Sequence, residues 1–461
     1  MPEFSLASAR SWLLGSVLGL FILPLDAISA EQGSNLSELV VGETLKDFFY
    51  AAIDFSPRLQ IAKESLNIVQ AREEQARALL KPQVNANANL TDNTRNSFTS
   101  FGSPVTDTFT GERLSVSIQQ ILFNWQAFSA RRRASQIVNQ TEAEYFDELS
   151  ILLADVANRY FLVLFAQDSI TSLSSEIEAV TNQLNQIQSL FSLQLAQITD
   201  LRQAEASLAS VQAQQLRLQA ELAVAQERLR AITGIEIGDL HILSEETPLP
   251  EPNGDMFFWL DTAARNNMQI SAKRFALRAA DESISETRGA YMPRVNLFAT
   301  RQDSNVGFDN RFLGDTDNTF IGVDVNIPLY AGGANRARES EARAIRNIAE
   351  SELRQTELET STNIRSAFLQ VQSSVLLNEA AERLVASTRL SSDAAREGFE
   401  LGTVNSVDVL NTLRNQFQAE RDLQQARYEQ INFFLSLKRE AGALTADDLE
   451  EISNLMVKPD S

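Results

Sequence analysis

Cysteine is absent from the 461-residue chain, and histidine occurs only once, as His241. Without cysteine there is no disulfide scaffold, no thiolate metal site, no cysteine nucleophile and no lipid-modified N-terminal cysteine. A single histidine leaves little for an imidazole metal cluster or for a histidine-based catalytic triad. We therefore expect no resident metal, no cofactor and no enzymatic activity.

Basic residues are also scarce, because 40 Lys and Arg stand against 61 Asp and Glu, for a formal net charge of −21. Proteins that bind nucleic acid gather Lys and Arg on one face to neutralise phosphates. The charge balance therefore predicts no nucleic-acid partner. The sequence also lacks a Gly-rich phosphate loop ending in Lys-Ser/Thr, so we expect no nucleotide to be consumed by the chain itself.

Long hydrophobic runs are rare, and the one clear case lies near the N-terminus. An apolar run from Trp12 to Leu25 follows Arg10 and precedes small residues around Ala30. This is the layout of a secretory signal peptide, and the run is shorter than the about 20 residues of a transmembrane helix. We predict a signal peptide at 1–30, with a retained anchor as the alternative, and an exported mature chain.

Two halves of the chain repeat the same features in the same order, which indicates two copies of one unit. The matched positions keep a nearly constant spacing: Pro82 and Pro293, Val116 and Val323, Phe161 and Phe368, Asp200 and Asp408, Gly234 and Gly442. The predicted segments are a first structural repeat at 31–234, a linker at 235–254, a second repeat at 255–442 and a C-terminal tail at 443–461.

Each copy is predicted to contain one very long helix. Residues 334–400 contain no proline, their only glycine is Gly398, and apolar residues recur at three- and four-residue spacing. At 1.5 Å per residue, such a helix is roughly 100 Å long. The first copy shows the same pattern from about 127 to 194, and a coiled-coil seam follows at 201–232.

Four shorter segments alternate apolar and polar residues, as β-strands with one apolar face do. They are 83–91, 114–118, 295–300 and 321–327. One interpretation is a soluble sheet with one wet face. The other is a set of membrane strands, because we expect strands of about nine or ten residues around these segments, the length that crosses a bilayer as a tilted strand. We expect long polar loops to join the strand pairs at about 92–111 and 302–317.

Aromatic residues flank these segments on one side, at Phe123, Trp125, Tyr291 and Tyr330. Aromatic girdles mark the lipid–water interface of membrane barrels. The four residues are therefore candidate membrane-interface aromatics, although ordinary packing at a strand end would also use them.

Four strands are too few to close a barrel, since about eight is the smallest bacterial case. An open sheet edge in lipid leaves unpaired backbone groups that cost several kcal/mol each, by the usual order of magnitude. If the strands span a membrane, several chains must therefore pool them. Obligate oligomerisation follows from the strand count under the membrane interpretation.

Several stretches resemble the TolC family of outer-membrane efflux proteins, in the right order over nearly the whole mature chain. The family's entry helix is similar to LKDFFYAA at 45–52 and SPRL at 56–59. Its turn from the last strand into a long helix is similar to PLYAGG at 328–333. Its most recognisable stretch is similar to GFELGTVNSVDVLN at 398–411, and the tail LTADDL at 444–449 also fits.

The resemblance implies a mainly α fold with membrane β: a long α-helical barrel plus four strands per chain in a trimeric, twelve-stranded transmembrane β-barrel. It implies an outer-membrane location with a helical tunnel in the periplasm. It further implies a homotrimer in contact with outer-membrane lipid, docked by a periplasmic adaptor (membrane fusion) protein and an inner-membrane pump or ABC transporter. The expected function is a passive export duct for drug efflux or type I protein secretion.

In this family the periplasmic end closes at two helix junctions, which fall here near 195–201 and 403–411. The resemblance implies that Asp408 contributes to a ring of carboxylates at the constriction, where three like charges would attract cations. A second acidic position of the family is Asn411 here, so we expect a less charged ring. The alternative for Asp408 is that it caps the helix that follows.

The family also closes this end with a polar latch, whose partners in the first copy match Thr199 and Asp200. The latch tyrosine is replaced by Phe399 and the latch arginine by Val404. We therefore expect closure by helix packing together with Asp408, and a weaker polar lock.

Two alternatives of other classes stay open from the sequence. One is a structural or adhesive coiled-coil surface protein, which the duplicated strand pairs between the helices disfavour. The other is a diffusion porin, which has many strands per chain and little helix.

Overall fold

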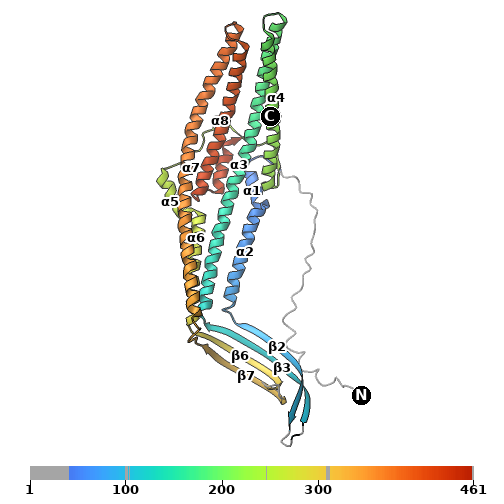
Figure 1. The fold of residues 1–461 in the computed structure, drawn as a ribbon, viewed down its shortest axis with the longest axis vertical. Coiled ribbons are helices and arrows are strands. Elements are labelled where there is room, and N and C mark those ends of the chain that lie inside the picture. The colour runs from blue at the N-terminus through green and yellow to red at the C-terminus, as the bar shows by residue number, and fades with distance from the viewer. Residues whose placement is uncertain (1–40, 99–101, 103, 245–246, 308–311, 459–461) are drawn as a thin grey trace, which may run out of the picture. The chain divides into compact units, whose positions relative to one another are not determined.

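The structure, a computed structural model, describes residues 41–98, 102, 104–244, 247–307 and 312–458. The predicted signal peptide at 1–30 lies outside the described residues. Val41–Ser461 forms one compact unit, in which helices occupy one part and a four-stranded sheet lies at one end of them (Figure 1).

The helical elements, in chain order, are α1 (Leu45–Phe55), α2 (Pro57–Ala78), α3 (Trp125–Ser192), α4 (Ile198–Thr233), α5 (Met256–Asn266), α6 (Met268–Arg288), the 3₁₀ turn η1 (Gly289–Tyr291), α7 (Ala334–Glu400), α8 (Ser406–Glu440) and α9 (Ala446–Asn454). The four long strands are β2 (Gln83–Phe98), β3 (Pro104–Phe123), β6 (Arg294–Val306) and β7 (Phe312–Asn326). Four two-residue strands complete the list: β1 (Val41–Gly42), β4 (Glu236–Ile237), β5 (Ile242–Leu243) and β8 (Met456–Val457).

The order of two helices, two long strands, a very long helix and a further helix occurs twice along the chain. The predicted helix at 334–400 coincides with α7 at both ends, and the one predicted at 127–194 is α3 to within two residues at each end. An uninterrupted run without proline is sufficient to find these helices, because proline is the residue that most strongly ends one.

The strands are longer than the alternation predicted, and the expected long loops at 92–111 and 302–317 are wrong. β2 and β3 stay paired from Gln83 opposite Gln119 out to Phe98 opposite Pro104. β6 and β7 are likewise paired out to Val306 opposite Phe312. Backbone groups hydrogen-bond regardless of side chain, so the ladder continues through Asn, Thr and Asp residues after the apolar alternation has ended.

The sheet has the order β2-β3-β6-β7 and all neighbours are antiparallel. Its register places the four predicted apolar faces side by side: Val84 pairs with Ile118, Ile118 with Ala299, and Ala299 with Ile321. Val84, Ile118 and Ile321 are exposed. The sheet therefore presents a continuous apolar face that no other element of the described chain covers.

The long helices change neighbours along their length. Near the sheet the contacts run α2–α3, α3–α6 and α6–α7, the same order as the strands to which these helices connect. Toward the other end the contacts run α7–α8, α8–α3 and α3–α4. Only α3 and α7 take part in both rows, and each extends along the helical part from the sheet to the far end (Figure 1).

The largest core surrounds the middle of α3. Val156, Tyr160, Phe161 and Leu164 are buried there against α1, α8, α9 and the short strands. By length and composition alone, α3 is long and apolar enough to span a membrane, and half of its most apolar window is buried within the protein. Because its apolar side chains pack into this core, α3 is a core helix of the protein.

The linker and the tail contain regular structure that the sequence did not predict. Within 235–254, β4 pairs with β1 and β5 pairs with β8. Within 443–461, α9 buries Leu449 and Ile452 in the large core. Proline occurs at 248, 250 and 252, which favours irregular backbone. Two-residue strands are also too short to show an alternation.

Candidate functional site

The two helix pairs α3/α4 and α7/α8 each turn back at the end farthest from the sheet (Figure 1). These turns, which we call the tips, contain the residues predicted to form the periplasmic aperture. The two tips contact each other within one chain, because Leu410 of α8 packs with Val180 and Ile187 of α3 and with Leu201 of α4.

The α7/α8 tip is a tight turn closed by backbone hydrogen bonds. Thr403 and Val404 donate their N–H groups to the carbonyl of Gly398 at 2.8 and 3.2 Å. Gly402 has φ +73°, a left-handed conformation that glycine adopts without a side-chain clash.

Asp408 lies in the first turn of α8 and is exposed. Its N–H donates to Asn405 Oδ1 at 2.9 Å, and its Oδ2 accepts from Asn405 Nδ2 at 2.7 Å. Asn405 is therefore the cap of α8, and Asp408 supports it while adding negative charge at the positive end of the helix dipole. The capping alternative is thus part of the local structure, and it leaves the Asp408 carboxylate at the surface of the tip.

The α3/α4 tip repeats this arrangement without glycine. Gln194 has φ +62° and is the one described non-glycine residue with positive φ. Gln197 caps α4 and Asp200 accepts from the Gln197 N–H at 3.4 Å, as a capping box. Asp200 and Asp408 therefore hold the same position in the first turn of equivalent helices.

Phe399 and Val404 pack together at the α7/α8 tip with Val409, Leu413 and Phe417. Phe399 also contacts the apolar cluster of the α3/α4 tip. Residues in these positions contribute through dispersion and burial and carry no polar group that could form a latch.

Thr199 and Asp200 find polar partners only within their own tip in the described chain: Thr199 Oγ1 donates to Gln197 Oε1 at 3.3 Å. Asn411 accepts from Arg414 on its own helix at 3.3 Å. Within one chain, the structure brings Phe399 and Val404 together and leaves Thr199, Asp200, Asp408 and Asn411 on the surface of the two tips.

A polar layer that sequence reasoning missed crosses the helices on the sheet side of the tips. Arg421 Nη1 of α8 donates to Glu176 Oε2 of α3 at 2.7 Å, and both side chains are almost completely buried, at 7% and 2% exposure. Nearby, the Tyr428 hydroxyl of α8 donates to Asp168 Oδ2 of α3 at 2.6 Å. These bonds join the α3/α4 pair to the α7/α8 pair.

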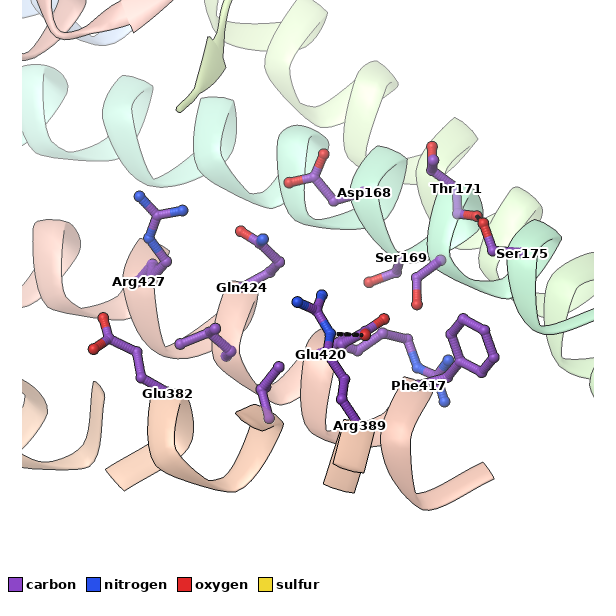
Figure 2. Close-up of a pocket in the computed structure, with 14 residues that line it drawn as sticks. Asp168, Ser169, Thr171, Ser175, Glu382, Arg389, Phe417, Glu420, Gln424 and Arg427 are labelled. Carbon is purple, nitrogen blue, oxygen red and sulfur yellow. Dashed lines mark hydrogen bonds and ion pairs between the residues drawn. The ribbon is translucent and has the colours of Figure 1, made fainter. Parts of the chain in front are cut away.

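Beside this layer is a cavity of about 470 Å³ between α3, α7 and α8 (Figure 2). Figure 2 shows Asp168 and Ser169 on α3 opposite Gln424 and Arg427 on α8, with the Arg389–Glu420 ion pair of 2.7 Å between α7 and α8. Burial raises the pKa of Asp168 above its ordinary value, and the hydrogen bond from Tyr428 partly offsets this. Burial likewise raises the pKa of Glu176, against the opposing effect of Arg421.

A signal for the missed pair does exist in the sequence. Glu176 belongs to a stripe of α3 in which buried residues recur every three or four positions, and the stripe reads Ser169, Leu173, Glu176, Val180, Gln183, Ile187. A charged residue inside such a stripe must be paired when it is buried. Its partner, however, is more than 200 positions away and is not deducible from a single helix.

The predicted membrane-interface aromatics all lie where the strands meet the helices. Phe123 ends β3 and its ring is 6.2 Å from that of Phe128. Trp125 begins α3 and donates from Nε1 to Ser285 of α6 at 3.2 Å. Tyr291 is half exposed and Tyr330 is 88% exposed. Trp125 thus packs within the chain, and Tyr330 is the most open to its surroundings.

Among the residues that the structure describes, no group of three or more His, Asp or Glu side chains is arranged to hold a metal ion. The contacts described at the tips and in the polar layer are apolar packing, helix capping and ion pairing.

The model of the outer membrane efflux protein family matches the chain twice, over residues 49–235 and 259–443. The chain is 26% identical over 436 residues to the outer membrane protein TolC of Vibrio cholerae, covering 94% of this chain and 98% of that protein. It is 26% identical over 342 residues to the alkaline protease secretion protein AprF of Pseudomonas aeruginosa, covering 74% of this chain and 71% of that one.

The fold is also found among solved structures. The outer membrane protein VceC of Vibrio cholerae superposes with a TM-score of 0.73 at 20% identity, covering 86% of this chain and 96% of that chain. The predicted TolC-like fold is thereby confirmed. The family matches cover most of the chain, and with the helix tips, the exposed apolar sheet and the duplicated element order they lead to one conclusion: the chain belongs to the outer membrane efflux protein family and is an export duct of the outer membrane.

Proposed function

We propose that the chain works as a homotrimer, in which three copies close a twelve-stranded barrel in the outer membrane and a helical tunnel below it. The observation that carries this proposal is the pair of open edges of the sheet. In the described chain β2 pairs only with β3, and β7 pairs only with β6. Unpaired backbone groups of this kind are prohibitively costly in lipid, so the edge of β7 requires the β2 edge of another copy.

The helices leave open faces on the same two sides. Near the sheet, α2 and α7 are the ends of the helix row; toward the tips, α4 and α7 are the ends. Each of these helices exposes large apolar residues: Ile61 and Ile68 on α2, Leu216 and Val224 on α4, and Leu358 and Leu376 on α7. A ring of copies in which α7 meets α2 and α4 of the next copy covers all of them.

In such a trimer the tips of all copies converge, and Asp408 of each lies at the constriction with Asn411, Phe399, Val404, Thr199 and Asp200 around it. The packing of Phe399 and Val404 supports closure by apolar contact with a weak polar lock. The exposed tips are the surface on which a periplasmic adaptor would dock, and the adaptor would link the duct to an inner-membrane pump or ABC transporter.

The duct is proposed to be passive and non-enzymatic, with energy supplied by the pump. The name of the relative AprF refers to protease secretion, and the matching family is described by efflux. We therefore propose type I protein secretion or small-molecule efflux as its task. The aromatics Phe123, Trp125, Tyr291 and Tyr330 are proposed to lie at the periplasmic interface of the membrane, next to lipid.

The trimer is tested with the full chain extracted from membranes in mild detergent. The mass of the protein component, measured by light scattering, is expected to be three times that of one mature chain, and the particles are expected to conduct ions in a planar bilayer. A monomeric mass in a well-folded, helix-rich sample contradicts the trimer. A trimer in which Asp408→Ala leaves conductance and block by multivalent cations unchanged contradicts the aperture role of Asp408.

A further inference from the structure

The ion pair between Glu176 and Arg421 is the one buried ion pair among the described residues that joins the α3/α4 pair to the α7/α8 pair. Besides Glu176, Arg421 contacts Gln418 of its own helix, to which Nη2 donates at 3.1 Å. The nearest direct bond between the two helix pairs on the sheet side is Tyr428 to Asp168.

Glu176 and Arg421 lie at nearly the same distance from the tips. At 1.5 Å per residue, Glu176 is about 24 Å before the end of α3, and Arg421 is about 22 Å after the start of α8. Between this ion pair and the tips, the contacts between the two helix pairs are apolar, through Val180, Ile187 and Leu410. On the sheet side of the ion pair, the rings of Phe161 and Tyr428 stack in the large core, with their centroids 5.7 Å apart.

A buried ion pair contributes little net stability, because removing two charges from water costs about as much as their attraction returns. Burial indeed raises the pKa of Glu176, which shows that the site disfavours an isolated carboxylate. What such a pair does supply is geometry, since its short bond is satisfied in one relative position of the two helices only. The apolar contacts near the tips tolerate a shift of one helix along the other more easily than a hydrogen-bonded ion pair does.

We infer that Glu176 and Arg421 are a positioning pair that holds the α7/α8 pair of helices against the α3/α4 pair, and so sets how far apart the tips stand. This inference rests on the proposed gating at the tips. The polar contact that restrains the tips is then the buried pair of Glu176 and Arg421, about 20 Å from the constriction. At the constriction itself, Phe399 and Val404 provide no polar latch.

The consequence of losing one partner follows from the burial. Arg421→Met removes the hydrogen-bonded partner of Glu176 and leaves Arg414 as a cation that still favours the ionised form. A carboxylate that stays ionised there is hydrated only if water enters between α3 and α8. The adjoining cavity of about 470 Å³, which Arg421 lines, provides the route. The helix pairs then separate and the tips open. Glu176→Met together with Arg421→Met removes both charges, and an apolar contact of similar volume takes their place.

A matched control is available at the adjacent residue of α8, Glu420. Arg389 and Glu420 form an ion pair of the same length, 2.7 Å, but it joins α7 to α8 within one helix pair and is more exposed. Arg389→Met removes the same type of charge at a similar height without affecting the contact between the helix pairs. Glu176→Gln is a milder second variant, which keeps an acceptor for Arg421 and guards against a folding failure of Arg421→Met.

The first readout is the conductance of the full-length trimer in planar bilayers, well below its unfolding temperature. Arg421→Met is expected to raise the open fraction roughly tenfold, and Glu176→Gln by less. The double variant and Arg389→Met are expected to stay within about twofold of the wild type, since coupled residues are not additive. A double variant as open as Arg421→Met, or a control as open as Arg421→Met, overturns the inference.

The second readout separates this inference from the proposed gate. Because the chain has no cysteine, spin labels can be attached at Ser189→Cys on α3 and Asn415→Cys on α8, both exposed positions near the tips. In trimers containing one labelled chain, the distance between the labels is expected to increase in Arg421→Met and to return in the double variant. An increase without a change in conductance supports the positioning pair and refutes gating at the tips. An unchanged distance refutes the positioning pair itself.

Discussion

The sheet and the helical part of this chain treat their apolar residues in opposite ways. In the sheet, Leu90, Ile321 and Val323 are exposed, and the polar residues alternate with them on the other face. In the helical part, large side chains such as Tyr160 and Phe161 are buried in a core around α3. One chain therefore contains two arrangements that a single solvent would not allow.

The difference identifies the solvent of each region. A continuous apolar face on water is costly, since burial of apolar surface yields about 25 cal/mol per Å². The same face in lipid is favourable, and the ladder satisfies the backbone of the strands except at the two edges, β2 and β7. The helical part follows the rule for water-soluble proteins. We propose that the boundary between the two solvents lies at the junction where Trp125 and Tyr330 are found.

The sharpest way to break this comparison is to place a charge on the apolar face of the sheet. Val323→Arg puts a guanidinium where lipid is expected, and should destabilise the folded trimer in membranes by about 2–4 kcal/mol. The neighbouring change Asp324→Arg faces the other side of the strand and is expected to have little effect. Unfolding by denaturant in lipid vesicles measures both.

Equal free energies of unfolding for Val323→Arg and Asp324→Arg would mean that both faces of the sheet meet water. That result would remove the difference between the two regions and, with it, the membrane interpretation of β7.

An intermediate effect on stability is expected at the tips, which lie outside both the apolar sheet and the large core. Gly402→Ala adds a side chain at φ +73°, and should cost about 1–2 kcal/mol, the usual penalty of left-handed backbone for a residue with a Cβ. At the equivalent turn, Gln194→Gly relieves the same penalty and should stabilise the helix pair α3/α4 by a smaller amount.

Thermal unfolding of both variants measures these two changes, which have opposite signs. Changes of the same sign would show that the two tips are not equivalent turns. A Cβ added at Gly402 has no neighbour within 4 Å, so a loss of stability in Gly402→Ala is attributed to the backbone conformation and not to a steric clash.

The smallest expected effect is on the pH dependence of stability, and it concerns Asp168, a buried carboxyl group of the helical part. Burial raises the pKa of Asp168, so the folded state holds this proton more tightly than the unfolded state does. The resulting stabilisation is present below the unfolded pKa of about 4 and is lost as the pH rises through the raised folded value. Asp168→Asn keeps an acceptor for Tyr428 and removes this titration.

Thermal midpoints between about pH 4 and pH 8 should therefore depend less on pH in Asp168→Asn than in the wild type, and its midpoint at neutral pH should not be lower. Tyr428→Phe is the matched control, because it leaves the Asp168 carboxylate buried without its donor and should lower the midpoint at neutral pH. A lower neutral midpoint for Asp168→Asn would contradict the sign derived from burial.

Much of the fold could be predicted from local pattern. The bounds of α7 follow from the absence of proline and from Gly402, which permits the turn, and the strand faces follow from alternation at Val84 and Ile321. Strand length could not be predicted, because the ladder beyond Leu90 is formed by backbone groups that leave no apolar signature. The adhesive coiled coil and the porin are excluded by the family assignment.

The candidate site was predicted less completely. The tips were located correctly in the chain, because the turn at Gly402 has a recognisable sequence, whereas the aperture role of Asp408 stays a prediction. The pair of Glu176 and Arg421 depends on the packing of α3 on α8, which joins residues far apart in the sequence. A charged residue in a buried stripe indicates that a partner exists, and only the tertiary structure identifies it.

The exchange of neighbours by α3 and α7 has a mechanical consequence. Of the long helices, these two alone extend past the level of the large core, where α2 and α6 begin and α4 and α8 end. Strain that arises at the tips can therefore reach the membrane sheet through two continuous rods per chain, while every other helix ends at the level of the large core. The core around Tyr160 holds α3 at mid-length, and a separate cluster, in which Ile364 and Val371 pack with Trp259 of α5, holds α7. We expect these two packing contacts to limit how much of a movement at the tips is transmitted along α3 and α7 to the sheet.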